Sequence, residues 1–145
     1  MGRRREPTEF IDKFGAVKRR IMAAAAQSYA TAELGGTQAK FVRYIGRNSG
    51  ISQAELARAT ETDPTLTGRV LQTLIDRELV RRQRSDEDRR EYLLELSAAG
   101  RRVCSRVEKL RAELAARVVD ALDDRDLDDF DRVADKILAA LAQNP

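Results

Sequence analysis

Apolar residues recur at steps of three and four along most of the chain, a spacing that predicts helices with one buried face. A first helix is predicted from Thr8 to about Glu33, where two glycines interrupt the pattern. A second is predicted to begin at Thr37, because threonine favours helix N-caps. Two long helices are predicted towards the end of the chain, one capped by Ser97 and one beginning at Asp123. The pattern therefore predicts a mainly helical protein.

Between residues 52 and 76 the pattern predicts two short helices separated by a tight turn. Ser52 and Glu55 form a capping box, in which each side chain accepts a hydrogen bond from the other residue's backbone amide. Asp63 followed by Pro64 starts the next helix, since Asp caps free amides and Pro needs no N–H there. The buried stripe of this helix is expected at Leu66, Val70, Leu71, Leu74 and Ile75. Two capped helices joined by a short turn predict a helix-turn-helix.

Residues 79–84 and 91–96 are predicted to form two strands, because turn-forming residues at 85–88 separate them. A hairpin placed directly after a helix-turn-helix is a wing. Five arginines surround this hairpin, namely Arg81, Arg82, Arg84, Arg89 and Arg90. An arginine at the tip of such a hairpin can enter a narrow minor groove of DNA. We expect the acidic residues 86–88 to orient these arginines rather than to bind a metal.

The outward face of the helix that starts at Pro64 carries short polar side chains. Successive helical residues lie about 100° apart, which places Thr65, Arg69, Gln72 and Asp76 opposite the apolar stripe. Arginine can bond guanine through two hydrogen bonds, glutamine can bond adenine, and threonine can contact a phosphate or a thymine methyl. With the capped turn and the basic hairpin, this face predicts insertion into a major groove. The alternative is an ordinary solvated helix face.

Composition excludes several other classes of function. The chain has no histidine, so a His-based general base, a Ser-His-Asp triad and a histidine metal site are excluded. Its single cysteine excludes an intrachain disulfide and a thiolate zinc cluster. An enzyme that uses carboxylates such as Asp86 and Asp88 is disfavoured, because no glycine-rich phosphate loop accompanies them. We expect no cofactor, no metal, no membrane span and a cytoplasmic location.

Three segments resemble the MarR family of winged-helix regulators, named for multiple antibiotic resistance: 52–58, 74–80 and 88–100. The last fits the family's wing pattern DxRxxxxxLTxxG at Asp88, Arg90, Leu96 and Gly100, with Ser97 in place of the usual threonine. The resemblance implies a mainly α fold with a small β-wing. It implies an N-terminal arm and dimerisation helix over 1–34, a winged helix-turn-helix core over 35–97, and C-terminal dimerisation helices over 98–145.

The resemblance implies a bacterial or archaeal, nucleoid-associated homodimer that binds an inverted-repeat operator in double-stranded DNA. It implies a repressor that a small effector releases, with an anionic aromatic or acyl-CoA-type compound as the effector. The DNA-contacting positions implied are Thr65, Leu66, Gly68, Arg69 and Gln72, with Arg84, Asp88, Arg89 and Arg90 in the wing. Three positions depart from the family. Gly68 stands where Thr or Ser is common. Thr67 replaces an apolar residue and is expected to be partly buried. Glu78 replaces a helix-ending glycine, so the C-terminal end of this helix is expected to close differently.

Two sets of residues are candidates for sensing a signal. The effector candidates implied are Phe14, Val17, Arg20, Ile21, Arg43, Tyr44 and Asn48, although the three apolar ones also fit a dimer core. An oxidant could be sensed at Cys104 if Arg101, Arg102 and Arg106 lower its pKa, whereas a buried Cys would be inert. A further interpretation is a protein-interaction scaffold whose basic wing faces an acidic partner.

Overall fold

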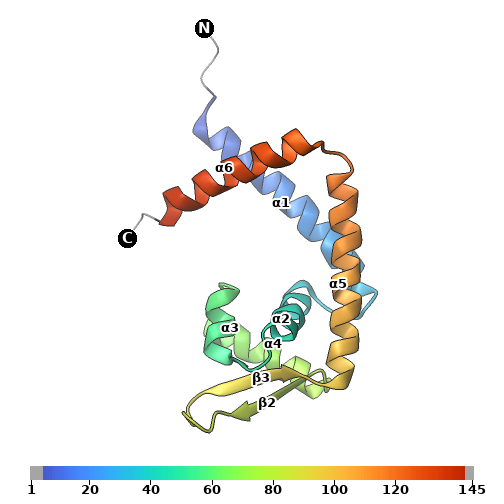
Figure 1. The fold of residues 1–145 in the computed structure, drawn as a ribbon, viewed down its shortest axis with the longest axis vertical. Helices are drawn as coiled ribbons and strands as arrows, with labels where there is room; N and C mark the ends of the chain where they lie inside the picture. Colours follow the sequence, from blue (N-terminus) through green and yellow to red (C-terminus); the bar gives the residue numbers. More distant parts are fainter. Residues whose placement is uncertain (1–4, 143–145) are drawn as a thin grey trace. The chain divides into compact units, whose positions relative to one another are not determined.

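The computed structural model describes residues 5–142, so the first four residues of the expected N-terminal arm lie outside it. The chain divides into two compact units, residues 1–111 and 112–145. The helices are α1 (Pro7–Ala30), α2 (Gly36–Arg47), α3 (Gln53–Ala59), α4 (Pro64–Asp76), α5 (Ala98–Val119) and α6 (Asp124–Ala142) (Figure 1). The strands are β1 (Ile51–Ser52), β2 (Val80–Arg84) and β3 (Tyr92–Leu96). The predicted mainly α fold with a small β-wing is confirmed.

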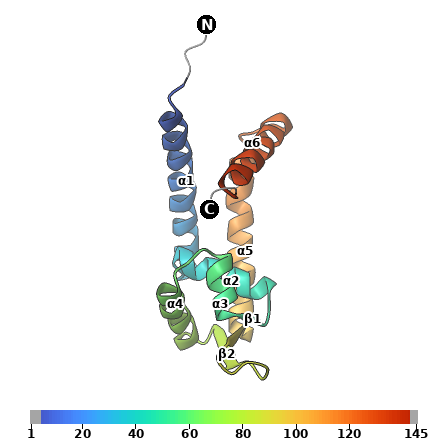
Figure 2. The same ribbon diagram turned by 90° about the vertical axis from the view of Figure 1, so that its left-hand side faces the viewer.

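The sheet is antiparallel, with β3 between β1 and β2. In the wing hairpin Val80 pairs with Leu96 and Arg84 with Tyr92, which agrees with the two predicted strands. The short strand β1 was not predicted, because two residues are too few for a periodic signal. Helices α2, α3 and α4 gather beside the strands in both views (Figures 1 and 2).

One apolar core joins these elements into a winged helix. The largest fully buried apolar side chains are Phe41, Val42 and Ile45 from α2, Leu56 from α3, Leu71 and Leu74 from α4, Leu94 from β3 and Val107 from α5. Because every element of the helix-turn-helix and the wing contributes to this core, packing places α4 and the hairpin in a defined relation to each other.

The junction between α1 and α2 differs from the prediction at both helix ends. Helix α1 stops at Ala30, three residues early, because the chain turns through Glu33 with φ of +57°. Helix α2 begins at Gly36 with Gly35 as N-cap, two residues before the predicted N-cap Thr37. The local reason is that the side chain of Gln38 accepts a hydrogen bond of 3.0 Å from the Gly35 amide.

The end of α4 closes in the way that glycine would close it. Glu78 has φ of +60°, and the amide of Leu79 bonds the carbonyl of Leu74 at 3.0 Å. This is the left-handed closure that usually uses glycine. The expectation that Glu78 would make this end close differently is therefore wrong, since the backbone keeps the geometry and Glu78 carries the strain.

The buried stripe of α4 is also shifted from the prediction. Thr67 is buried, with 1% of its surface exposed, and its hydroxyl donates to the carbonyl of Asp63 at 2.9 Å. Leu66, predicted to be in the stripe, is 38% exposed. Leu66 lies at the edge of the apolar face of α4. Thr67, with its hydroxyl bonded to the backbone, occupies the buried place that was predicted for Leu66.

Large apolar side chains lie exposed on α1 and on α6, each taken within its own unit. They include Phe10, Phe14, Val17 and Ile21 on α1, and Phe130, Leu138 and Leu141 on α6. Contiguous exposed apolar surface marks an interaction site. Among residues 5–142, no helix is long and apolar enough to cross a membrane.

Candidate nucleic-acid interface

The first turn of α4 is held by its N-cap, as the Asp-Pro pair predicts. The carboxylate of Asp63 accepts hydrogen bonds from the amides of Thr65 at 2.9 Å and of Leu66 at 3.2 Å. The capping box of the preceding α3 is also present, with Glu55 donating its amide to the Ser52 hydroxyl at 3.1 Å. Both helices of the helix-turn-helix therefore begin at defined residues.

The outward face of α4 is polar and exposed, as the helical arithmetic predicts. Thr65, Arg69, Gln72 and Asp76 all lie on the surface. The Gln72 amide donates to the Asp76 carboxylate at 2.8 Å. This bond uses one N–H of Gln72 and leaves its oxygen and second N–H available. The helical pattern predicts Asp76 on this face but gives it no role, although its i to i+4 spacing from Gln72 allows such a bond.

Gly68 lies on the side of α4 that faces α3. A Cβ added there would lie 3.7 Å from the amide nitrogen of Gln53, an ordinary contact distance. Packing therefore does not require glycine at this position. The expected role of Gly68 in close approach to DNA stays a prediction.

The wing is stiffened by an arginine–tyrosine cluster. The guanidinium groups of Arg82 and Arg84 lie 4.6 Å and 5.0 Å from the centre of the Tyr92 ring, within cation–π range. Arg84 also donates to the Tyr92 hydroxyl at 3.0 Å and to the carbonyl of Arg89 at 2.7 Å. Arg84, predicted to contact DNA, is thus already used in holding the hairpin together.

The tip of the wing is a turn closed by its own hydrogen bonds. The hydroxyl of Ser85 accepts from the amides of Glu87 and Asp88, each at 3.2 Å. The Asp88 carboxylate in turn accepts from the amide of Arg90 at 3.0 Å and from its guanidinium at 3.2 Å. The side chain of Arg90 remains 91% exposed. The predicted role of Asp88 in orienting an arginine is therefore confirmed.

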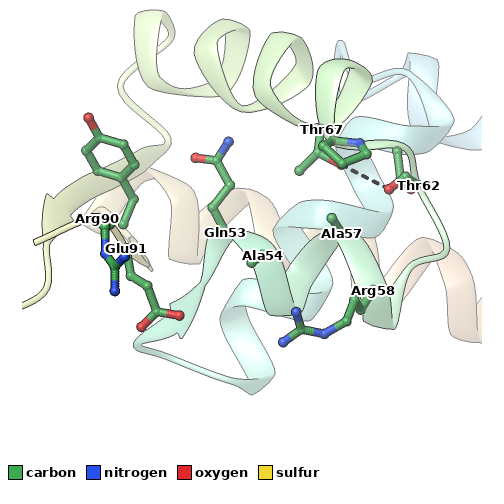
Figure 3. A pocket seen from close by; sticks show the side chains of 10 residues that line it. Gln53, Ala54, Ala57, Arg58, Thr62, Thr67, Arg90 and Glu91 are labelled. Atoms are coloured by element: carbon green, nitrogen blue, oxygen red, sulfur yellow. Dashed lines mark hydrogen bonds between the residues drawn. The ribbon is translucent and has the colours of Figure 1, made fainter. Parts of the chain in front are cut away.

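A groove of about 460 Å³ lies between α3, the start of α4 and the wing. Figure 3 shows Thr62 and Thr67 at one end, Arg90 and Glu91 at the other, and Gln53 between them. From α4 the groove is lined only by Pro64 and Thr67, so neither the outward face of that helix nor any effector candidate lines it.

The effector candidates fall on two helices. Phe14, Val17, Arg20 and Ile21 lie exposed along α1, whereas Arg43 and Tyr44 on α2 are half-buried. Asn48 uses its amide to cap α2, donating to the carbonyl of Tyr44 at 2.9 Å. One polar group expected to receive a ligand, the Asn48 amide, is thus engaged with the backbone of α2.

Cys104 is half-buried on α5 beside α2. Burial raises the pKa of its thiol, and the charge of Glu108 raises it further, whereas Arg47 and Arg43 lower it. The pKa is therefore above its ordinary value, the opposite of what a reactive thiol needs.

The three arginines expected to lower the pKa of Cys104 do not do so. Arg106 donates to the backbone carbonyl of Thr31 at 3.2 Å, and Arg101 donates to that of Leu96 at 3.3 Å. Arg102 is exposed, and neither it nor the other two contributes to the pKa shift of the thiol. The expectation was wrong because neighbours in sequence on a helix need not share a face.

Comparison with known proteins adds an independent line of evidence. A family model described as the MarR family matches residues 33–91. The HTH-type transcriptional regulator BilQ of Clostridium symbiosum (strain WAL-14163) is 30% identical over 86 residues, covering 59% of this chain and 60% of BilQ. The match thus spans less than two thirds of that relative's length.

Solved structures resemble the chain over nearly its whole length. A MarR transcriptional regulator from Methanosarcina mazei Go1 is 25% identical with a TM-score of 0.81, covering 93% of this chain and 98% of that one. The MepR–DNA complex of S. aureus is 16% identical with a TM-score of 0.82, covering 94% and 99%. The second likeness concerns the fold alone.

Proposed function

We propose that the chain, which matches the MarR family model over residues 33–91, is a transcriptional regulator of that family that binds double-stranded DNA sequence-specifically. One observation carries the proposal: Thr65, Arg69 and Gln72 lie together on the exposed face of a firmly capped helix, beside a wing that ends in exposed Arg90. An α-helix fits the major groove of B-DNA, whereas an arginine at a hairpin tip fits the minor groove.

Each residue has a distinct role in this proposal. Arg69 donates two hydrogen bonds to a guanine edge in the major groove. Gln72, with its amide tied to Asp76, presents its oxygen to an amino group of adenine or cytosine. Arg90, aimed by Asp88, enters the minor groove. Thr65, Leu66, Gly68 and Arg89 line the approach, and Arg84 supports the wing.

We infer that two copies act together. The exposed apolar faces of α1 and α6 would cost free energy in a monomer, and burying each against a second copy would remove that cost. Two-fold symmetry then requires an inverted-repeat site, with the recognition helices roughly 34 Å apart. In this arrangement residues 1–34 and 98–145 supply dimer contacts, and residues 35–97 supply the DNA-binding core.

We further propose that a small anionic aromatic or acyl-CoA-type effector releases the DNA, as in a repressor. The exposed apolar residues Phe14, Val17 and Ile21, with Arg20 nearby on the same helix, offer apolar surface and a positive charge. Thermal-shift titration with salicylate and with a coenzyme-A thioester tests this part. A rise in Tm that is absent in an Arg20→Ala variant supports it, and an unchanged Tm with every compound contradicts it.

Selection of bound duplexes from a random DNA pool tests the DNA-binding proposal directly. The wild-type chain is expected to enrich an inverted repeat. Arg69→Ala is expected to lose base preference at one position in each half-site, because one base contact is removed. Arg58→Ala on α3 removes the same charge from an exposed residue with no proposed base contact and should enrich the wild-type motif. Failure to enrich any motif at low salt would contradict the proposal and favour a protein-interaction role.

A further inference from the structure

The connection between α1 and α2, residues 31–35, is held by two arginines from other elements. Arg77, at the C-terminal end of α4, donates to the carbonyl of Glu33 at 2.7 Å. Arg106 of α5 donates to the carbonyl of Thr31 at 3.2 Å and to its hydroxyl at 3.3 Å. The connection lies beside α5 in Figure 1. A segment of five residues thus contacts both the C-terminal end of the recognition helix and α5.

The connection itself has one defined conformation. Leu34 is buried in the core, and its amide bonds the carbonyl of Tyr29 at 3.2 Å. Glu33 adopts φ of +57°, a conformation that costs free energy for a residue other than glycine. Surrounding contacts must hold it there, and the bond from Arg77 acts on the carbonyl of this same residue.

Arg77 is an unexpected residue for this contact. An exposed arginine at the end of a recognition helix would ordinarily be assigned to a DNA phosphate. Its guanidinium instead reaches back to a residue 44 positions earlier in the chain. The hydrogen bond from the charged Arg77 guanidinium to the Glu33 carbonyl is stronger than a hydrogen bond between neutral groups, although its exposure to solvent weakens it.

We propose that Arg77 and Arg106 are positioning residues, which fix the direction in which α1 leaves the winged helix and so set the separation of the two recognition helices. The proposal rests on the proposed function, in which α1 lies at the dimer contact. A small rotation at the connection has a large effect because α1 is long. The 24 residues of α1 extend about 36 Å, so a rotation of about 5° at the connection displaces the far end by about 3 Å. That is close to the rise of one base pair, about 3.4 Å.

The test compares operators whose half-sites differ only in their spacing. Duplexes carrying the enriched half-site at centre-to-centre distances of about 8 to 12 base pairs are titrated by fluorescence anisotropy. Wild type is expected to prefer one spacing by about tenfold over its neighbours. Arg77→Gln and Arg106→Gln should reduce this preference to about threefold or less, with an unchanged salt dependence. Arg77→Lys should keep the preference, since lysine can still donate to the Glu33 carbonyl.

Hydrogen exchange and the salt dependence of binding distinguish a failure of this proposal from a failure of the proposed function. Hydrogen exchange of the Leu34 amide, measured without DNA, should quicken by about tenfold or more in Arg77→Gln and stay unchanged in Arg111→Gln, a control on α5. Unchanged exchange in Arg77→Gln would overturn the proposal even if DNA binding cannot be measured for that variant. A uniform loss of affinity at every spacing, with a salt slope reduced by about one, would make Arg77 a phosphate contact instead. Failure of wild type to bind any duplex would refute the proposed function.

Discussion

Replacing Gly100 by alanine should destabilise the protein strongly, because α5 passes the start of β2 with no room for a side chain. A Cβ at Gly100 would overlap the carbonyl oxygen of Leu79 and lie 3.0 Å from its carbonyl carbon. It would also lie 3.2 Å from the Cβ of Leu96. The obstructing atoms belong mainly to backbone, so no change of rotamer relieves the overlap.

The magnitude follows from what must move. The carbonyl of Leu79 accepts from the amide of Ser97 at 3.0 Å. The Ser97 hydroxyl donates to the carbonyl of Glu78 at 2.6 Å and accepts from the Gly100 amide at 3.0 Å. Shifting α5 weakens these bonds, each worth about 0.5–1.5 kcal/mol net. Overpacking adds about 1–3 kcal/mol. We expect Gly100→Ala to lower the free energy of unfolding by about 3–5 kcal/mol.

Gly36→Ala is the matched control, because a Cβ there meets nothing within 4 Å. It should stabilise the protein by about 0.5 kcal/mol through helix propensity. Urea unfolding followed by circular dichroism measures both variants at one protein concentration, because the stability of a dimer depends on concentration. A Gly100→Ala variant within about 1 kcal/mol of wild type would refute the packing argument.

Three other substitutions or reactions test separate parts of the structure. Glu78→Gly should raise the free energy of unfolding by about 0.5–1 kcal/mol, because glycine adopts positive φ without strain; lower stability in urea would contradict this. Asp76→Ala should free the Gln72 amide and so weaken the base preference at the position that Gln72 contacts, which the random-pool selection would show as a broader motif. An unchanged motif would exclude a role for the Gln72–Asp76 hydrogen bond in base recognition. Cys104, whose pKa burial raises, should react with iodoacetamide at pH 7 at least about tenfold more slowly in the folded protein than in urea. Its reactivity should still be increasing as the pH rises past the ordinary pKa of a thiol. Faster reaction in the folded protein would reverse that assignment.

Features set by neighbouring residues were predictable from sequence. The Asp63 cap and the Ser52–Glu55 box were expected from the letters alone, because both partners lie within three residues of each other. The polar face of α4 followed from helix geometry. The predicted burial of Leu66 was wrong, because a residue at the edge of an apolar stripe is buried or exposed according to its neighbours in space. Thr67 took the buried place because its hydroxyl bonds the backbone.

Features set by distant residues were not predictable. The contacts from Arg77 to Glu33 and from Arg106 to Thr31 join positions 44 and 75 residues apart. No local pattern marks those arginines among the many others. The mistaken pKa expectation for Cys104 has the same origin, because the nearby charges that act on it come from α2 and from one turn along α5.

The central claim is that the exposed face of α4 reads base edges, and a double substitution across the interface tests it most directly. Arg69→Ala is combined with 7-deazaguanine at the guanine whose preference depends on Arg69, and all four combinations are titrated by anisotropy. Each change alone is expected to weaken binding by about 1–3 kcal/mol. The two changes together are expected to weaken it by little more than Arg69→Ala does alone, because both remove the same contact. Fully additive losses, or equal loss on a scrambled duplex, would show that Arg69 does not contact that base.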